Sequence, residues 1–285
     1  MRLAVVSTIA DTRVLIAAAR KRGLTIGVVP TMGALHEGHA ALIARARRET
    51  GYVVVTLFVN PIQFDRKEDL DRYPRPLEAD LEYCQSFGVD AAFTPRTGEM
   101  YPDELLTFVE VGGLSSRLEG EFRPGHFRGV ATVVAKLLNI VQADRAYFGE
   151  KDAQQLAVIQ KMVADLNMPV TIVPVETVRE PDGLALSSRN RLLAPEHRAI
   201  APLLYRALSA ARSVIEAGAA DPQEPRKAAL FVLAQAPDFR LDYLEVVDPG
   251  TFLPVDHITA EVRIAAAAWL GSVRLIDNIR CKPTF

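Results

Sequence analysis

The chain has 285 residues, of which 49% are hydrophobic and 24% charged, and a formal net charge of −2. This length allows one large or two modest domains with a substantial core. No lysine- or arginine-rich block stands out, so we expect no nucleic-acid partner. Neither an apolar run of ~18 residues nor a leader-like start is present, which predicts a cytoplasmic protein without a membrane span. The spacing of Cys84 and Cys281 matches no metal or redox motif, and buried, reduced thiols are favoured over a disulfide.

The first part of the chain alternates helical and strand patterns. Helical spacing is present at 11–22, 38–49, 77–87, 130–141 and 153–166, and β-rich runs lie at 24–29, 52–59, 91–94, 145–148 and 170–175. The nearly continuous apolar run at 52–59 is typical of a parallel strand covered on both faces. This alternation predicts an α/β fold with a doubly wound parallel sheet that binds its ligands at the carboxyl ends of the strands.

The pattern changes in the last third of the chain. Helices are expected at 196–218 and 225–236, and short strands at 241–247, 261–267 and 273–276, separated by proline and glycine turns. We therefore predict two domains, residues 1–178 and a smaller α+β domain at 179–285.

The most informative segment, PTMGALHEGH from Pro30, follows the strand pattern at 24–29 and enters the next helix. Its histidines, His36 and His39, are three residues apart and can share one face of the first helical turn. Free N–H groups and the helix dipole attract phosphate to such a position, where imidazoles can donate hydrogen bonds. A capped helix start with solvent-exposed rings is the alternative interpretation. The place of the segment after a buried strand and a glycine turn favours a phosphate site.

A second predicted strand-to-helix junction carries FGEKDAQQ from Phe148. Lys151 offers a positive charge for phosphates, and Asp152 can cap the helix or contact a ribose hydroxyl. Gln155, one turn later, can point toward the same cleft. Without other motifs, Gly-Glu-Lys-Asp is equally typical of a surface turn.

A third segment, LSSRNR from Leu186, lies at the predicted domain junction. Ser187 and Ser188 followed by Arg189 suit a mobile phosphate clamp that forms when ATP binds. A polar linker is the alternative interpretation of this segment.

A fourth segment, FVNPIQF from Phe58, ends a predicted buried strand. Asn60 and Gln63 offer amides at the ligand edge of the sheet, and the aromatic rings can wall a small pocket. The charge-rich run at 65–71 is typical of a mobile lid, although an ordinary loop is the alternative. His126, in RPGHFRG from Arg123, falls in a further candidate pocket loop.

Together these segments resemble the pantothenate synthetase, or pantoate–β-alanine ligase, family. The resemblance extends over nearly the whole chain through PTMGALHEGH, FVNPIQF, RPGHFRGVATVV, FGEKDAQQL, DGLALSSRNR and RLIDNI, in that order. It implies a Rossmann-like nucleotidyltransferase core in which HEGH corresponds to the HIGH motif of class I synthetases. It also implies a homodimer that converts pantoate, β-alanine and Mg-ATP to pantothenate, AMP and pyrophosphate through a pantoyl adenylate.

The resemblance also implies roles for individual residues. His39 is the implied catalytic residue, and His36 and Lys151 join it as groups able to stabilise charge at a phosphate. Implied ATP contacts are Met32, Gly33, Ala34, Leu35, His36, Glu37, Gly38, His39, Gly149, Glu150, Lys151, Asp152, Val178, Leu186, Ser187, Ser188 and Arg189. Gln63 and Gln155 are implied to hold pantoate, with Gln63 also near β-alanine and Asn60 as a further pantoate candidate.

We expect no dedicated protein ligands for Mg²⁺, because this ion normally enters such sites with the triphosphate. Asp80 and Glu119 are candidates for water-mediated or pocket contacts. The smaller domain is expected to form a mobile cover of the active site.

Four other functions stay open on these residues. A nucleotidylyltransferase that stops at an adenylated product would share the HxGH segment. A zinc hydrolase would use His36, Glu37 and His39, although the zincin pattern places its histidines four apart. A non-catalytic nucleotide-binding regulator would not need the histidines, the lysine and the clamp together. A truncated transfer-RNA synthetase would need an anticodon-binding domain or a basic surface.

Overall fold

The computed structural model describes residues 2–284, which form two compact units. Of these residues, the first unit comprises 2–116, 123–150 and 158–176, and the second comprises 117–122, 151–157 and 177–284. The chain thus enters the second unit in two short excursions before it stays there. The domain division at residue 178 and the mobile cover formed by the second domain stay predictions.

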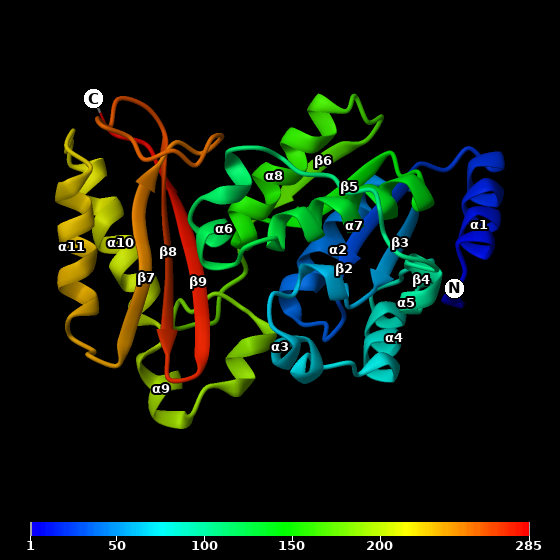
Figure 1. Ribbon diagram of the computed structural model, residues 1–285, viewed down its shortest axis with the longest axis horizontal. Coiled ribbons are helices and arrows are strands. Elements are labelled where there is room, and N and C mark those ends of the chain that lie inside the picture. Colours follow the sequence, from blue (N-terminus) through cyan, green and yellow to red (C-terminus); the bar gives the residue numbers. More distant parts are fainter. Residues whose placement is uncertain (1, 285) are drawn as a thin grey trace. The chain divides into compact units, whose positions relative to one another are not determined.

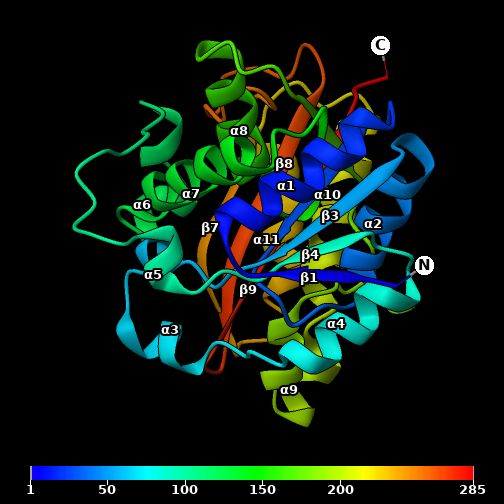
Figure 2. The ribbon, with the colours of Figure 1, turned by 90° about the vertical axis from the view of Figure 1, so that its right-hand side faces the viewer.

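A six-stranded parallel sheet forms the centre of the first unit. Its strands are β1 (Ala4–Val6), β2 (Ile26–Thr31), β3 (Tyr52–Leu57), β4 (Ala91–Phe93), β5 (Arg145–Gly149) and β6 (Thr171–Val175), in the order β1-β4-β3-β2-β5-β6. Figure 2 shows β1, β4 and β3 side by side. Every residue of β3 is buried, as its apolar sequence predicts for a strand covered on both faces.

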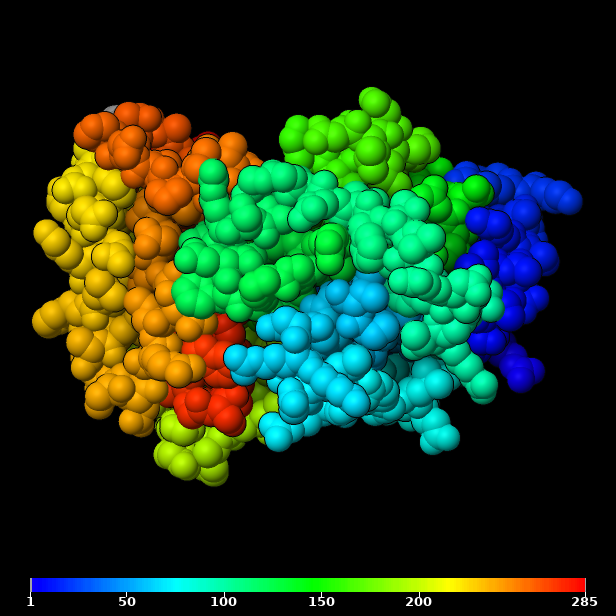
Figure 3. Space-filling view, in the orientation of Figure 1, coloured from blue at the N-terminus to red at the C-terminus, as the bar shows by residue number. Residues whose placement is uncertain are grey.

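Helices connect these strands. They are α1 (Ile9–Lys21), α2 (Glu37–Glu49), α3 (Lys67–Arg72), α4 (Leu77–Ser86), α5 (Thr97–Met100), α7 (His126–Val141) and α8 (Ala153–Asp165), with 3-10 turns η1 (Pro61–Gln63), η2 (Leu114–Ser116) and η3 (Glu150–Asp152). α1 and α7 contact each other and β2, and α2 contacts β2, β3, β5 and β6. The charged helix α3, light blue in Figure 3, lies on the surface of the unit and has no buried residue.

The strand order reverses beside β2. The chain moves from β2 to β3 on one side, and it returns from β4 to β5 on the other side of β2. Ligands of doubly wound sheets bind at such a switch point, outside the carboxyl ends of the strands. In this sheet β2 leads into the segment Met32–His39, and β5 ends at Gly149, so two of the predicted nucleotide segments begin at adjacent strand ends.

The second unit contains a three-stranded antiparallel sheet in the order β7-β8-β9. Its elements are β7 (Phe239–Val247), β8 (Val262–Leu270), β9 (Val273–Cys281), α6 (Glu119–Phe122), η4 (Ser188–Leu192), α9 (Pro195–Ile200), α10 (Leu203–Glu216) and α11 (Gln223–Leu233). α10 packs on β8, β9 and α11, and α11 packs on β7 (Figure 1). Leu204, Leu208 and Ile215 of α10 are fully buried in the resulting core.

Two predicted elements differ from the observed ones. The helix expected at 196–218 is divided into α9 and α10 at Ala201–Pro202, because proline lacks the N–H that a continuous helix needs and clashes with the preceding turn. The strand expected at 273–276 continues to Cys281 as β9. Its polar residues Asp277 and Asn278 are buried and paired, which hides the strand from a search for apolar alternation.

Both cysteines are free and buried, as predicted. Burial raises the pKa of the Cys84 thiol to about 12. Burial likewise raises the pKa of the Cys281 thiol to about 12. Within residues 2–284, each helix is too short or too polar to span a bilayer.

Candidate active site

Two histidines form the N-terminus of α2. His36 is the N-cap, and its Nδ1 lies 3.1 Å from the backbone N of Gly38. Nδ1 of His39 lies 3.3 Å from the backbone N of His36, and the two ring centroids are 4.2 Å apart. Because each Nδ1 accepts a backbone hydrogen, the proton of each neutral ring resides on Nε2. The rings therefore cap the helix and also carry N–H donors suited to phosphate oxygens.

Gly38 makes this arrangement of rings sterically possible. A Cβ atom at position 38 would lie 2.8 Å from Cε1 and 3.0 Å from Nδ1 of His36. Any larger residue would therefore displace the imidazole of His36 from the start of the helix. The glycine of the HEGH segment thus serves the position of a neighbouring side chain.

A buried carboxylate fixes the turn before α2. Gly33 and Ala34 both have positive φ angles, of 82° and 52°. Asp80, from α4, accepts hydrogen bonds from the backbone N of Ala34 at 2.9 Å and of Leu35 at 2.8 Å. A non-glycine residue in the left-handed region is uncommon and costs free energy. Asp80 offsets this cost by accepting hydrogen bonds from both N–H groups of the turn. Its observed contacts are therefore with the backbone, whereas the sequence suggested a water-mediated or pocket contact.

The amide of Gln63 is held by its neighbours in the first unit. Its Oε1 accepts from Nδ2 of Asn60 at 3.0 Å, and its Nε2 donates to Sδ of Met32 at 2.9 Å. Asn60 is 1% exposed, and its amide also bonds Gly129 O and the hydroxyl of Tyr101. Burial raises the pKa of Tyr101, so this hydroxyl keeps its proton and donates. Asn60 therefore orients Gln63, while its predicted contact with pantoate stays a prediction.

His126, at the start of α7, supports the same region. Its Nδ1 lies 2.8 Å from the backbone O of Gln63, and its Nε2 lies 3.1 Å from Nη1 of Arg123. A carbonyl only accepts and a guanidinium only donates, so Nδ1 carries the proton and Nε2 is the acceptor. These contacts therefore favour the neutral Nδ1–H form. The buried ring of His126 links the backbone of Gln63 to Arg123. The sequence predicted only that His126 lies in a candidate pocket loop.

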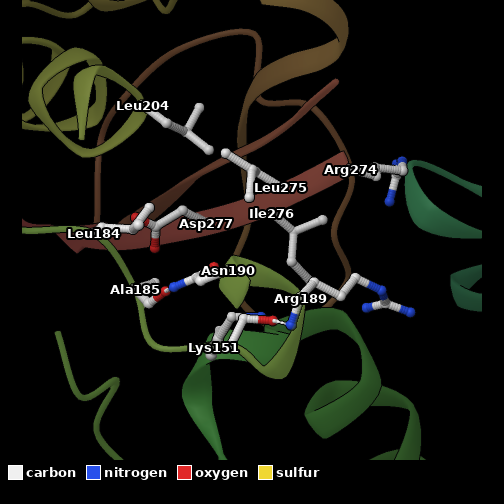
Figure 4. A pocket seen from close by; sticks show the side chains of 11 residues that line it. Lys151, Leu184, Ala185, Arg189, Asn190, Leu204, Arg274, Leu275, Ile276 and Asp277 are labelled. Carbon is white, nitrogen blue, oxygen red and sulfur yellow. Dashed lines mark hydrogen bonds between the residues drawn. The ribbon is translucent and has the colours of Figure 1, made fainter. Parts of the chain in front are cut away.

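The second unit contains a small pocket of its own. Its lining includes Lys151 of η3, Ser187, Arg189 and Asn190 of the predicted clamp, and Arg274 and Asp277 of β9. Figure 4 shows Lys151, Arg189 and Asn190 grouped beside β9. Two of the segments predicted to bind nucleotide, around Lys151 and Ser187–Arg189, are thus brought together within this unit.

The predicted clamp is held by local hydrogen bonds. Ser187 is the N-cap of η4, and its Oγ accepts from the backbone N of Arg189 at 3.2 Å. Nδ2 of Asn190 donates to the backbone O of Ala185 at 3.0 Å. The backbone N of Leu186 donates to O of Val178 at 3.0 Å, so two further predicted ATP contacts pair with each other. Leu186, Ser187, Ser188 and Arg189 are all half-buried, so the loop keeps polar atoms at its surface.

Asp152, the last residue of η3, is exposed, and Gln155 in the first turn of α8 is half-buried. Their buried neighbour Gln154 was not singled out by sequence. It accepts from the backbone N of Glu119 at 3.1 Å and donates to O of Arg117 at 2.7 Å. Gln154 therefore ties α6 to α8 within the second unit.

Glu119 forms part of a buried ionic cluster. Its carboxylate accepts from Nη1 of Arg274 at 2.7 Å and from the hydroxyl of Tyr243 at 2.9 Å. Nε of Arg274 donates to Asp242 at 2.7 Å. Desolvation lowers the pKa of Arg274, but the hydrogen bond with Glu119 and the charge of that carboxylate outweigh it and raise the pKa overall. The sequence suggested Glu119 as a candidate for a water-mediated or pocket contact. Its observed partners are Arg274 and Tyr243, which are structural contacts.

Comparison with known proteins shows the family of the chain. The chain matches the protein family described as pantoate-beta-alanine ligase over residues 4–280. The chain belongs to the pantoate–β-alanine ligase family. This membership confirms the resemblance seen in the sequence and the ligase activity expected from it.

Individual members of the pantoate–β-alanine ligase family are similar along almost their whole length. A pantothenate synthetase of Moorella thermoacetica is 52% identical over 272 residues, which cover 95% of this chain and 96% of the relative. The crystal structure of pantothenate synthetase from Thermus thermophilus has a TM-score of 0.93 and 50% identity, with coverage of 98% and 100%. The Rossmann-like fold class with a smaller α+β part is thereby confirmed.

A third member is described with ligands. The crystal structure of pantoate-beta-alanine ligase from Francisella tularensis, complexed with beta-gamma ATP and beta-alanine, has a TM-score of 0.81 and 34% identity. It covers 97% of this chain and the chain covers 97% of it. Family membership makes this chain a ligase, and the nucleotide and β-alanine are ligands of this relative.

Proposed function

We propose that the ligase joins pantoate to β-alanine in two displacement steps. In the first, a pantoate carboxylate oxygen attacks the α-phosphorus of ATP, and the bond to the bridging oxygen of pyrophosphate breaks. In the second, the β-alanine amine attacks the acyl carbon of pantoyl adenylate, AMP leaves and the amine loses a proton. The products are pantothenate, AMP and pyrophosphate. ATP is required because a carboxylate oxygen is a very poor leaving group until it is bonded to phosphate.

The pair His36 and His39 carries this proposal. The pantoate carboxylate is ionised near pH 7, so the first step needs no general base. It needs stabilisation of negative charge on a crowded phosphate and alignment of the reactants. Both Nε2–H groups are inferred from contacts at the N-terminus of α2, where backbone N–H groups and the helix dipole also favour an anion. We assign His39 and His36 as phosphate-stabilising groups.

We assign the amide of Gln63 to pantoate. One Nε2 hydrogen is directed to Met32 and the other is available in this arrangement, while Oε1 is held by Asn60. A fixed amide suits the hydroxyls and carboxylate of pantoate. Gln155 is the second pantoate residue, and Gln63 also lies near the β-alanine site in this proposal. Asn60 acts by orienting Gln63.

We assign Lys151, Ser187, Ser188 and Arg189 to the phosphates of ATP. The grouping of Lys151, Ser187 and Arg189 around one pocket of the second unit supports this assignment. The remaining nucleotide contacts are Met32 to Gly38, Gly149, Glu150, Asp152, Val178 and Leu186. In this proposal Mg²⁺ enters the site bound to the triphosphate, because this ion usually binds together with substrate phosphates.

A product assay tests the proposal. ATP, pantoate and β-alanine are mixed with the protein, and AMP, pyrophosphate and pantothenate are counted. We expect equal amounts of the three products. They should form only when pantoate and β-alanine are both present in excess over enzyme. A nucleotidylyltransferase that stops at its adenylated product would instead release pyrophosphate catalytically without any amine, and that result would contradict the proposal.

We also propose a homodimer in the cytoplasm with small-molecule substrates and no nucleic-acid partner. Family resemblance supports the dimer, and the absence of a basic block in the sequence supports the lack of a nucleic-acid partner. Light scattering coupled to gel filtration tests the dimer directly. A mass of twice 31.3 kDa is expected, and a single-chain mass at micromolar concentration would contradict it.

A further inference from the structure

The RLIDNI segment of β9 has no function in the mechanism above, although it contains two adjacent buried polar residues. Asp277 is 4% exposed and Asn278 is 7% exposed. Neighbouring residues on a strand point to opposite faces, so these two side chains reach different partners. A buried polar group costs free energy unless it is hydrogen-bonded, and the partners show what the pair stabilises.

Asn278 contacts the backbone of the pocket lysine. Its Nδ2 donates to the main-chain O of Lys151 at 3.0 Å. Its Oδ1 accepts from Nη1 of Arg263 on the neighbouring strand β8. The amide of Asn278 is thus fixed on one side by a guanidinium, and its other side fixes the main chain of η3. The side chain of Lys151 leaves from this fixed point.

Asp277 contacts the base of the hairpin that leads into the serine-arginine loop. Its carboxylate accepts from both terminal nitrogens of Arg179, at 2.6 Å and 2.9 Å. The same guanidinium donates to O of Gly183 at 3.1 Å and lies 3.9 Å from the ring of Tyr205. A paired, stacked guanidinium of this kind is held in one orientation.

The hairpin connects this ion pair to the phosphate-binding loop. Arg179 pairs with Ala185 as an isolated β-bridge, and Leu186 N bonds Val178 O beside it. Ser187 follows directly, and Asn190 returns to the hairpin through O of Ala185. Asp277 therefore fixes Arg179, and Arg179 fixes the strand pair from which Ser187 to Arg189 emerge.

We propose that the adjacent residues Asp277 and Asn278 are positioning residues for the ATP phosphates, Asn278 through Lys151 and Asp277 through Arg179 and the loop Leu186–Arg189. One dipeptide on a rigid edge strand thereby sets the spacing between a lysine and a serine-arginine loop that are far apart in sequence. This inference rests on the phosphate-binding role assigned to Lys151 and Arg189 above. A misplacement of about 1 Å in such groups can cost about a hundredfold in rate.

A double-mutant cycle separates positioning from general stability. Asn278→Asp keeps an acceptor for Arg263 but replaces the donor to Lys151 O with a second oxygen. Lys151→Ala removes the ammonium and keeps the main-chain O. We expect N278D to lower kcat/KM for ATP about tenfold in the wild-type background, the value of one well-placed hydrogen bond. In the K151A background it should have an effect of less than about twofold, because the group that it positions is gone.

Two outcomes distinguish this inference from the proposed function. If K151A turns over ATP as the wild type does, the role assigned to Lys151 is wrong and the inference falls with it. If K151A is impaired and N278D lowers its activity by the same further factor as in wild type, the inference alone is wrong. Asp248→Asn is the control, since Asp248 only caps a turn of the same unit through Gly250 and Thr251, and it should leave kcat/KM unchanged.

A second cycle remains usable if N278D does not fold. Arg179→Lys keeps a positive charge at a partly exposed position but loses the two-pronged contact with Asp277. R179K should lower kcat/KM for ATP in the wild-type background. In the Arg189→Ala background it should have little further effect, because the group that it positions is gone. Circular dichroism and the thermal midpoint establish that each variant is folded. Independent, multiplicative losses in this cycle would overturn the Asp277 half of the proposal.

Discussion

Nδ1 of His36 and Nδ1 of His39 accept backbone hydrogens from the same turn of helix, and their rings lie 4.2 Å apart. Each ring is therefore fixed by the helix that it caps, and each carries its proton on Nε2. Fixed donors are effective in catalysis because they need no reorganisation when charge develops on the phosphate. The structure shows the capped helix start, and the proposed phosphate site uses the same residues, so the two interpretations of the sequence are compatible.

Removal of either phosphate-stabilising group should abolish most activity without unfolding the protein. His39→Ala and Lys151→Ala are each expected to reduce adenylation by about 10²–10³, by comparison with the loss of one preorganised donor in other enzymes. Pyrophosphate release measures adenylation, and circular dichroism measures folding. His257→Ala changes an exposed histidine and is the control. Near-normal AMP production by both active-site variants would refute the assigned roles.

Gly38→Ala should separate activity from stability. Alanine is a better helix former than glycine by about 1 kcal/mol, but its Cβ would lie 2.8 Å from Cε1 of His36. We expect the imidazole to move, with at least a tenfold fall in kcat/KM for ATP and little loss of thermal stability. Gly98→Ala is the matched control, because a Cβ there meets no atom within 4 Å. Equal activity of the two variants would show that the position of His36 is unimportant.

Asp80→Asn should loosen the turn before α2. Two backbone N–H groups, of Ala34 and Leu35, each use a separate oxygen of Asp80, and an amide can satisfy only one of them. The expected cost is roughly 1–3 kcal/mol in the free energy of unfolding, with a higher KM for ATP. Urea denaturation measures the first quantity and steady-state kinetics the second. Asp238→Asn, at an exposed position outside the proposed site, should change neither. Unaltered stability of D80N would contradict the support assigned to this carboxylate.

His126 should affect pantoate through Gln63. His126→Leu removes the donor to the Gln63 carbonyl, whereas the amide of His126→Asn can still supply an N–H. We expect KM for pantoate to rise about tenfold in H126L and to recover at least in part in H126N, with a smaller change in kcat. Initial rates at varied pantoate concentration test this. Identical kinetics in the two variants would mean that the hydrogen bond to Gln63 has no such role.

Many of the helices, strands and turns could be predicted from the sequence because they depend on local residue patterns. The apolar run at 52–59 forms β3, and the glycine turn before His36 lies at the end of β2, as expected. The division of the long C-terminal helix had a visible signal in Pro202. Such features depend on neighbouring residues, which a sequence shows directly.

Other features depend on contacts between distant residues. The contact of Asp80 with the turn at Ala34 joins residues 46 positions apart and requires a backbone angle that alanine rarely adopts. Nothing near Asn278 in the sequence points to Lys151, which is 127 positions away. The placement of Arg117–Phe122 in the second unit likewise follows from Glu119, Gln154 and Arg274, which meet only after folding.

The proposed mechanism depends on a pantoyl adenylate intermediate, and mass spectrometry tests for this intermediate most directly. Protein at substrate-level concentration is mixed with Mg-ATP and pantoate without β-alanine, quenched, and searched for pantoyl-AMP. Pantoyl-AMP is expected together with an equal amount of pyrophosphate, and both the acyl group and AMP should pass into pantothenate and free AMP when β-alanine is then added. If protein that is active with all three substrates forms no pantoyl-AMP and no pyrophosphate in the absence of β-alanine, the two-step mechanism is contradicted.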